Sequence, residues 1–237
     1  SVSGTVSSDD LDPTGSLVVL TNGDVLGLLS DSVSIEPLIG FADATGAYSV
    51  DFAPDGQYFA MSLQFDLGVL EEVLEPASKV EIEGFGVGLH DGTGDGIADP
   101  VVIAGGSAET GVDISLHSSG STIQTLQAPV EDLIHQSAPD ARLSLGAGGG
   151  LEADGTGLVW MYIFTDLISG QAWLTSGIGQ VAFPPTRIDE NEDFGPIALL
   201  LATAQFTDYA DSDQAMTWYG AAGGQEFLEA NPDAIGA

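Results

Sequence analysis

Residues 43–65, DATGAYSVDFAPDGQYFAMSLQF, decide the fold class of this chain. Apolar and polar residues alternate in Ala47–Phe52 and again in Gln57–Phe65, and a Pro-Asp-Gly run occupies residues 54–56 between them. Alternation with a period of two is typical of strands that bury one face, and Pro-Asp-Gly is typical of a turn. The stretch therefore predicts two strands that pair as a β-hairpin.

Further short strand patterns lie on both sides of this predicted hairpin. They are Val2–Ser7, Leu17–Leu20, Ile35–Phe41, Val80–Leu89 and Gly111–Leu116. Turn residues separate these segments at short spacing, and the 32 glycines are about twice the usual share. Several strands without a long helix predict an antiparallel β-sandwich for residues 1–117.

The sequence pattern changes after a small polar stretch, HSSGS at residues 117–121, which predicts a linker. Beyond it, Pro129–Ser137 predicts a helix that begins at its proline. The apolar run Leu158–Thr165 predicts a strand buried on both faces, and Gln171–Ser176 predicts a second strand.

A last helix is predicted at Asp213–Ala222, with Ser212 as its N-cap and a Gly-Gly pair after its end. Residues 118–237 are therefore expected to form a smaller α+β domain, in which short helices accompany an antiparallel sheet. The fold class predicted for the whole chain is mainly β, with a β-sandwich first and this α+β domain second.

The charge of the chain is strongly one-sided. It has 36 acidic and 3 basic residues, which gives a formal charge of −33 at pH 7. Nucleic acid is excluded as a direct partner, because phosphate binding needs clustered Lys and Arg. No apolar run approaches the roughly 18 residues of a membrane span, so no transmembrane segment is expected.

Such acidity leaves two explanations open, a salt-rich medium or bound divalent ions, because like charges repel one another unless cations screen them. The chain has no cysteine, so no disulfide or thiol contributes to the fold. It begins with Ser1, and we expect a secreted or cell-surface protein whose signal peptide has been removed. A saline environment would suit the acidity of such a protein.

The clearest local motif is DGTGDGIAD at residues 91–99. Carboxylates stand at loop positions 1, 5 and 9, a hydroxyl stands at position 3, and glycine stands at position 6, where a tight turn needs it. Calcium prefers six to eight oxygen ligands, and the carbonyl of position 7 supplies one more. The predicted ligands are Asp91, Thr93, Asp95, Ile97 and Asp99.

The motif departs from an EF-hand, because Val102 stands where the bidentate Glu belongs and a strand pattern follows. A solvated Gly-Asp loop is the alternative interpretation. Asp9, Asp10 and Asp12 either complete this site, form a second site or belong to another solvated loop, and the solvated loop is the favoured interpretation. No catalytic motif accompanies the three histidines, so we expect no enzyme. Trp160 and its aromatic neighbours are interpreted as sheet core rather than a sugar-stacking surface.

The first half resembles the carboxypeptidase regulatory-like, transthyretin-type family of secreted β-sandwiches. The resemblance rests on VSGTVS at residues 2–7, DATGAYSVDFAPDGQYFAMSLQ at 43–64 and GVDISL at 111–116. It implies a folding and adhesion module and brings no catalytic residues.

The second half is similar to PepSY-like domains of secreted bacterial proteins. The similarity rests on LVWMYIFTDLISGQAWLTS at residues 158–176 and DSDQAMTWYGAAGGQEFLEANP at residues 211–232, and it does not extend to the topology of residues 177–208. It implies a binding or inhibitory module, again without catalytic residues.

Two functions are therefore expected from the sequence. The first is an extracellular structural protein, a calcium-stabilised subunit that assembles with copies of itself into a filament or surface appendage. Strand addition through residues 2–6 is the predicted contact between copies. The second is a calcium-dependent module of a secreted system that binds carbohydrate or protein.

Overall fold

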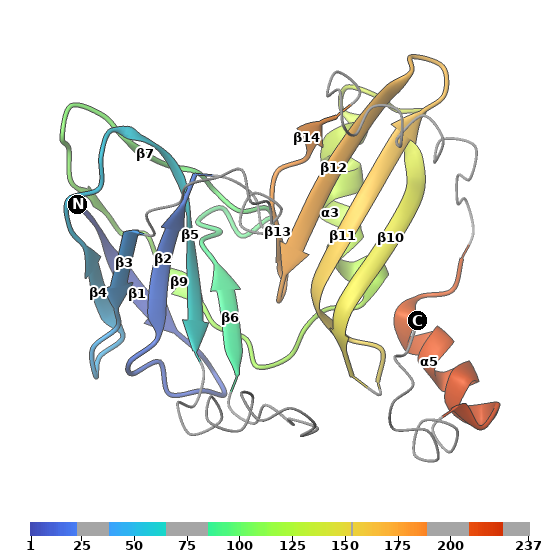
Figure 1. The fold of residues 1–237 in the computed structure, drawn as a ribbon, viewed down its shortest axis with the longest axis horizontal. Helices are drawn as coiled ribbons and strands as arrows, with labels where there is room; N and C mark the ends of the chain where they lie inside the picture. The colour runs from blue at the N-terminus through green and yellow to red at the C-terminus, as the bar shows by residue number, and fades with distance from the viewer. Residues whose placement is uncertain (23–37, 65–84, 153, 189–208, 225–237) are drawn as a thin grey trace, which may run out of the picture.

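The computed structural model describes residues 1–22, 38–64, 85–152, 154–188 and 209–224 (Figure 1). Over these residues the protein is mainly β, with three mostly antiparallel sheets and two helices. Parts of the predicted strands Ile35–Phe41 and Val80–Leu89 lie outside the described residues. No helix among the described residues is long and apolar enough to cross a membrane.

The first sheet is built around the N-terminal strand. Its strands are β1 (Val2–Ser7), β4 (Ala47–Val50), β8 (Glu109–Thr110) and β9 (Ile114–Ser115). β1 pairs antiparallel with β4 on one side and parallel with β8 and β9. Val2 and Val6 are 0% and 2% exposed. β1 is therefore an interior strand, and residues 2–6 would have to leave their own sheet to pair with another copy.

The second sheet faces the first. Its strands are β2 (Leu17–Thr21), β3 (Leu38–Phe41), β5 (Gly56–Gln64), β6 (Gly86–Leu89) and β7 (Val101–Ile103). They run in the order β3-β2-β5-β6, and β7 pairs with the start of β5. Alternate residues of both sheets, among them Val6, Val18 and Ala60, pack into one buried apolar cluster. The alternation that predicted the strands thus encloses a core, since burial of apolar surface drives the two sheets together.

The predicted hairpin of residues 47–65 is wrong, although both strands exist. β4 belongs to the first sheet and β5 to the second, so the turn between them crosses the core instead of joining neighbours. The Asp55 carboxylate fixes this crossing by accepting hydrogen bonds from the Gly105 and Gly106 amides at 2.8 and 2.9 Å. Alternation sets which face of a strand is buried, but it does not choose the strand's partner.

The third sheet contains only residues from the second half of the chain. Its strands are β10 (Arg142–Leu151), β11 (Gly157–Asp166), β12 (Gln171–Ile178), β13 (Val181–Ala182) and β14 (Thr186–Arg187). The order is β10-β11-β12-β13, with β14 also paired to β12. β11 is buried on both faces as predicted, because Tyr162 and Ile163 point to opposite sides and are 0% and 5% exposed.

Strand β10 was not predicted, because its sequence RLSLGAGGGL has too many glycines for a strand pattern. The glycines match the large side chains of β11. A Cβ on Gly148 would lie 2.4 Å from the ring of Trp160, the residue opposite it in the sheet. Trp160 therefore fills the space that a side chain at position 148 would need.

Helix α3 (Ile123–His135) packs on one face of the third sheet (Figure 1). The prediction that it begins at Pro129 is wrong, because the helix starts six residues earlier. The Thr122 side chain caps it by accepting a hydrogen bond from the Thr125 amide at 3.3 Å. Pro129 lies inside the helix, where it lacks an amide, and the buried side chains of Leu126, Val130 and Ile134 hold the helix on the sheet.

Helix α5 (Ser212–Ala221) confirms the predicted helix to within one residue, with Asp211 rather than Ser212 as its N-cap. Asp211 also accepts hydrogen bonds from the Thr122 hydroxyl at 2.7 Å and the Gln124 amide at 3.0 Å, at the start of α3. No residue of α5 is buried. The helix is thus anchored at one end and exposed along its length.

Residues 117–121, predicted as a linker, form a tightly packed connection that we call the fixed seam. Ser121 and Gly157 exchange two backbone hydrogen bonds of 3.1 and 2.9 Å, and a Cβ on Gly120 would lie 2.0 Å from the Gly157 oxygen. A buried apolar cluster then joins the outer face of the second sheet to the third sheet. At its centre Phe59 and Phe183 meet edge to face, with ring centroids 5.3 Å apart. The two halves are therefore packed against each other.

Candidate functional site

The acidic loop of residues 91–99 folds around the first of its aspartates. Asp91 Oδ1 accepts hydrogen bonds from the amides of Gly94 and Asp95 at 2.7 and 3.2 Å, and Oδ2 accepts one from Gly96 at 2.8 Å. Gly94 and Gly96 have φ angles of +72° and +82°, which favour glycine. The glycine spacing that suggested a tight turn therefore matches the backbone of the loop.

The other predicted ligands also bond within the loop. Asp99 Oδ2 accepts a hydrogen bond from the Thr93 amide at 2.9 Å, and Asp95 Oδ1 accepts one from the Ile97 amide at 2.9 Å. The Thr93 hydroxyl donates to Asp91 at 3.3 Å. Nowhere in the described parts of the chain do three His, Asp or Glu side chains converge as a metal site would require.

The same loop is one of the places where the two halves join. The Ala98 amide donates to the Ala182 carbonyl at 2.8 Å, and the Ala182 amide donates back to the Gly96 carbonyl at 2.9 Å. The Ile97 side chain packs on the core of the third sheet, and Gly96 lies against Pro129 of α3. Any change in the loop backbone is therefore transmitted to the contact between the halves.

A groove of about 560 Å³ runs beside the loop, and it combines residues from both halves. His90, Asp91, Asp113 and His117 line it from the first half, and Gln180 lines it from the β12–β13 turn. The backbones of Val87 and His117 exchange hydrogen bonds of 3.1 and 3.0 Å, so His117 lies beside β6, the strand that His90 directly follows. The two histidines are 27 residues apart in sequence, so no sequence spacing could have revealed this grouping.

A second cavity of about 350 Å³ adjoins this groove and shares Ser115, His117 and Gln180 with it. Asp9 and Asp10 line the second cavity. The acidic turn that contains them does not join the loop of residues 91–99 in one cluster of ligands. Its carboxylates bond nearby instead.

Those local bonds are of the kind that lower carboxyl pKa values. Asp10 accepts hydrogen bonds from the Ser118 and Ser8 hydroxyls, and Asp12 accepts them from the hydroxyl and amide of Thr14. These donors favour the charged form, so the pKa values of both carboxyls lie below their ordinary value of 3.8. Both groups are therefore ionised at neutral pH.

His90 has a defined orientation in the groove. Its Nδ1 lies 2.7 Å from the Asp113 carbonyl oxygen, which can only accept, so Nδ1 carries the hydrogen. In the neutral ring Nε2 is then a hydrogen-bond acceptor. The position of a Cβ on Gly92 would be 3.3 Å from this Nε2 and 3.5 Å from Asp99 Oδ2, so both groups border the same small space.

Asp113 is occupied by a different contact. Its Oδ1 accepts hydrogen bonds from the Thr5 hydroxyl at 2.6 Å and the Thr5 amide at 2.9 Å. The hydroxyl is the main cause that keeps the pKa of Asp113 below its ordinary value. The groove thus presents imidazole and carboxylate groups to a polar ligand.

The interpretation as sheet core is confirmed for the aromatic residues of β11 and β12 and is wrong for those of α5. Trp160 and Tyr162 are 4% and 0% exposed, and both donate hydrogen bonds to backbone carbonyls near the start of α3. The described lining of the groove includes no aromatic side chain. Trp218 on α5 is 58% exposed and lies elsewhere. The described lining of this site therefore offers no Trp, Tyr or Phe for sugar stacking.

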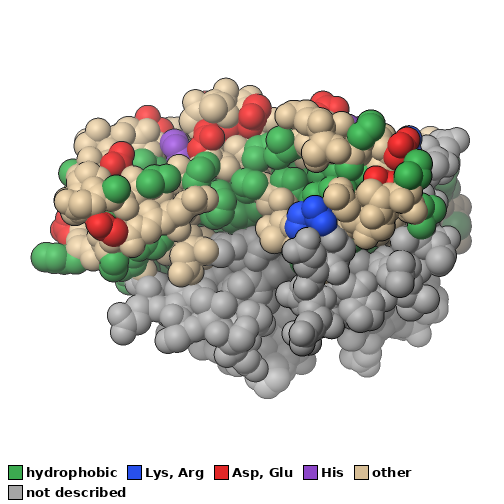
Figure 2. Space-filling view, turned by 90° about the horizontal axis from the view of Figure 1, so that it is seen from above, with side chains coloured by type: hydrophobic (Ala, Val, Ile, Leu, Met, Phe, Trp, Pro, Cys, Tyr) green, Lys and Arg blue, Asp and Glu red, His purple; other side chains and the backbone are tan. Residues whose placement is uncertain are grey.

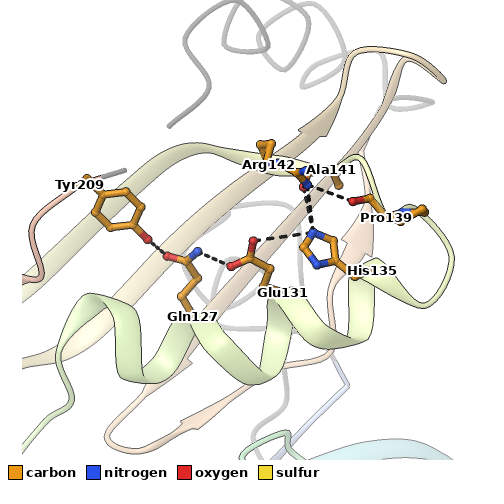
Figure 3. Close-up of polar contacts among 7 residues, drawn as sticks. All are labelled: Gln127, Glu131, His135, Pro139, Ala141, Arg142 and Tyr209. Carbon is orange, nitrogen blue, oxygen red and sulfur yellow. Dashed lines mark hydrogen bonds and ion pairs between the residues drawn. The ribbon is translucent and has the colours of Figure 1, made fainter. Parts of the chain in front are cut away.

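A row of polar contacts along α3 was not predicted (Figure 3). Gln127 accepts a hydrogen bond from the Tyr209 hydroxyl and donates one to Glu131 at 2.9 Å, and Glu131 lies 3.7 Å from His135 Nε2. The same His135 nitrogen is 2.9 Å from the Ala141 carbonyl oxygen. The spacing of four residues between the helical members was the available signal. These contacts tie α3 to the segments on either side of it.

Acidic side chains lie at several places on the surface drawn in Figure 2, and basic ones are few. Comparison of the chain with protein-family models, curated proteins and solved structures finds no match. The likeness of the two halves to transthyretin-type and PepSY-like domains therefore remains a prediction from sequence.

Proposed function

We propose that this chain is an extracellular structural protein, a two-domain unit that calcium stabilises and that assembles with its own copies. In this proposal a β-sandwich is followed by a smaller α+β domain. The observation that supports it best is the position of the acidic loop at the junction. Gly96 and Ala98 exchange backbone hydrogen bonds with Ala182 of the other half, so a cation held by the loop would strengthen the junction.

The loop chemistry supports calcium as that cation. Asp91, Asp95, Asp99 and the hydroxyl of Thr93 are hard oxygen donors, and the Ile97 carbonyl is a further candidate. A carboxylate has about four acceptor sites, so a carboxylate that accepts an amide bond still has sites for a cation. Binding requires the Asp95 and Asp99 side chains to turn toward Asp91.

The charge of −33 supports a role for cations in general. Like charges on the folded surface repel one another, and either salt or a bound divalent ion relieves the repulsion. An ion that binds only the folded loop raises the free energy of unfolding with the logarithm of the calcium concentration once that concentration exceeds Kd. At a calcium concentration a hundredfold above Kd, the free energy of unfolding rises by about 2.7 kcal/mol.

Calcium titration at constant ionic strength tests the metal site. We expect saturable heat of binding and a rising melting temperature for the wild type, and loss of both in Asp95→Ala. Asp132→Asn is the control, because it removes one exposed charge from α3 and should leave the calcium response unchanged. Equal responses of the wild type and both variants would show that general screening, and not this loop, explains the effect.

Sedimentation velocity of the full chain tests assembly. Species larger than the monomer are expected when calcium or salt screens the charge, since screening weakens the repulsion between copies. A monomer at every protein, calcium and salt concentration would contradict the structural role.

A calcium-dependent binding module is the second candidate, and the groove favours it. His90, Asp113, His117 and Gln180 offer hydrogen bonds to a polar ligand next to the loop. A glycan array with and without chelator tests this role. Binding that disappears with chelator and in His117→Ala would support it, and the absence of any bound glycan in both conditions would remove carbohydrate from consideration.

A further inference from the structure

Strand β10 forms the outer edge of the third sheet. It pairs with β11 on one side, and no described residue pairs with its other side (Figure 1). Ala147, Gly148 and Gly149 are exposed there. Along an edge strand, every second residue presents its N–H and C=O groups to the open side, which is a template for another strand.

Within residues 143–151 this edge carries none of the charges or prolines that usually protect an edge against pairing. Natural sheets protect an edge with charges, prolines or very short strands. β10 is ten residues long, and residues 143–151 contain neither an ionisable side chain nor a proline. A bulge occurs between Leu143 and Leu145, near the start of the strand, so the part from Leu145 onward remains regular.

We propose that two copies of this chain pair through β10, antiparallel and about a two-fold axis, to form one continuous sheet. The proposal rests on the self-assembly proposed above and names its contact. Two copies that each carry −33 repel one another wherever their carboxylates meet. Residues 143–151 contain no carboxylate, so a second copy can pair there without like charges in the strand contact. Residues 143–151 of a second copy offer the same uncharged strand, and antiparallel pairing matches a strand with itself.

Helix α5 supplies further surface at the same edge. The turn between β10 and β11 contacts the start of α5, because a Cβ on Gly155 would lie 2.3 Å from the Asp213 backbone. From that point α5 extends beyond β10 (Figure 1) with Trp218 58% exposed and Tyr219 37% exposed. Stable interfaces bury about 800 Å² on each partner, and one large aromatic contributes about 150–250 Å² of that. The exposed parts of Trp218 and Tyr219 therefore add apolar area to the strand contact.

Charge at the edge provides the first test. Gly149→Glu is suited to it, because a Cβ at Gly149 meets nothing within 4 Å and its φ is not in the left-handed region. The two-fold axis places two added carboxylates at the contact, so the dimer dissociation constant should rise at least tenfold in sedimentation equilibrium. Gly149→Ala is the matched control and should dimerise like the wild type.

Disulfide trapping provides the second test, because the chain has no cysteine of its own. Directly opposite residues of antiparallel strands point to the same face and lie about 4.5–5.5 Å apart between Cα atoms, within disulfide reach. Cysteine is introduced at Leu145, Ala147 and Gly149, singly and in pairs, and the oxidised full chain is analysed on a denaturing gel. At least one of these variants should form covalent dimers, and Val102→Cys, exposed on β7, should not.

The outcomes separate this inference from the proposed function. The β10 contact is overturned if Gly149→Glu assembles as well as the wild type and no β10 cysteine variant forms more covalent dimer than Val102→Cys. Self-assembly of the wild type would still stand in that case. A wild type that is monomeric under all conditions overturns both. Loss of dimer in Gly149→Glu together with trapping at β10 supports the contact.

Discussion

Removal of the Phe183 ring should uncouple the two halves of the protein. Phe183 is 1% exposed and meets Phe59 edge to face at 5.3 Å, within the cluster that joins the second and third sheets. Phe→Ala in a core costs about 3–5 kcal/mol. Both walls of this cluster are paired strands that cannot easily collapse into the cavity, so we expect Phe183→Ala to lose about 4–5 kcal/mol.

Urea unfolding with two probes measures this effect. All three tryptophans, Trp160, Trp173 and Trp218, are in the second half, so their fluorescence reports on that half alone. Circular dichroism reports on the strands of both halves. For the wild type the two curves should coincide, which is a test of a single cooperative transition. For Phe183→Ala the curves should separate, because each half then unfolds by itself.

Phe52→Ala is the control for this experiment, since Phe52 is 94% exposed and its ring contributes little to the core. It should change stability by less than about 0.5 kcal/mol and keep the two curves together. If Phe183→Ala loses less than about 1 kcal/mol and its curves still coincide, the joining cluster does not couple the halves, and the reasoning is refuted.

Three further predictions concern the backbone and the charges. Gly120→Ala should lose about 1–3 kcal/mol in urea unfolding, because its Cβ would lie 2.0 Å from the Gly157 oxygen and neither backbone can yield; unchanged stability would contradict the fixed seam. Phe52→Gly should gain about 1 kcal/mol while Phe52→Ala gains none, because the φ of +60° is strained for any residue with a Cβ, and equal midpoints for the two variants would argue against strain. The Thr5 hydroxyl holds the pKa of Asp113 below 3.8, so this contact stabilises the fold at neutral pH and its contribution is lost as the pH falls through the lowered pKa. When the pH is lowered from neutral to below 3.8, the free energy of unfolding of Asp113→Asn should therefore fall by less than that of the wild type. An identical fall in both proteins would show that the Thr5–Asp113 contact does not cause this pH dependence.

The candidate site was only partly predictable. The loop of residues 91–99 is local in sequence, so its glycines and the amide bonds of Asp91 follow from the residues themselves. The groove beside it depends on His90, His117 and Gln180, which come together only when β6, the segment after β9 and the β12–β13 turn have packed. No pattern within one segment encodes such a grouping.

The sequence by itself determined several strands and their buried faces, among them β4, β5 and β11, because the period of apolar residues is a property of each segment alone. It predicted β11 as a strand buried on both faces and placed α5 to within one residue. The tertiary structure decided the partners. β4 and β5 entered different sheets, α3 continued through Pro129, and the glycine-rich β10 became a strand against Trp160. Each of these outcomes depends on burial against residues distant in sequence. The free energy gained by this burial exceeds the helix or strand preference of any single residue.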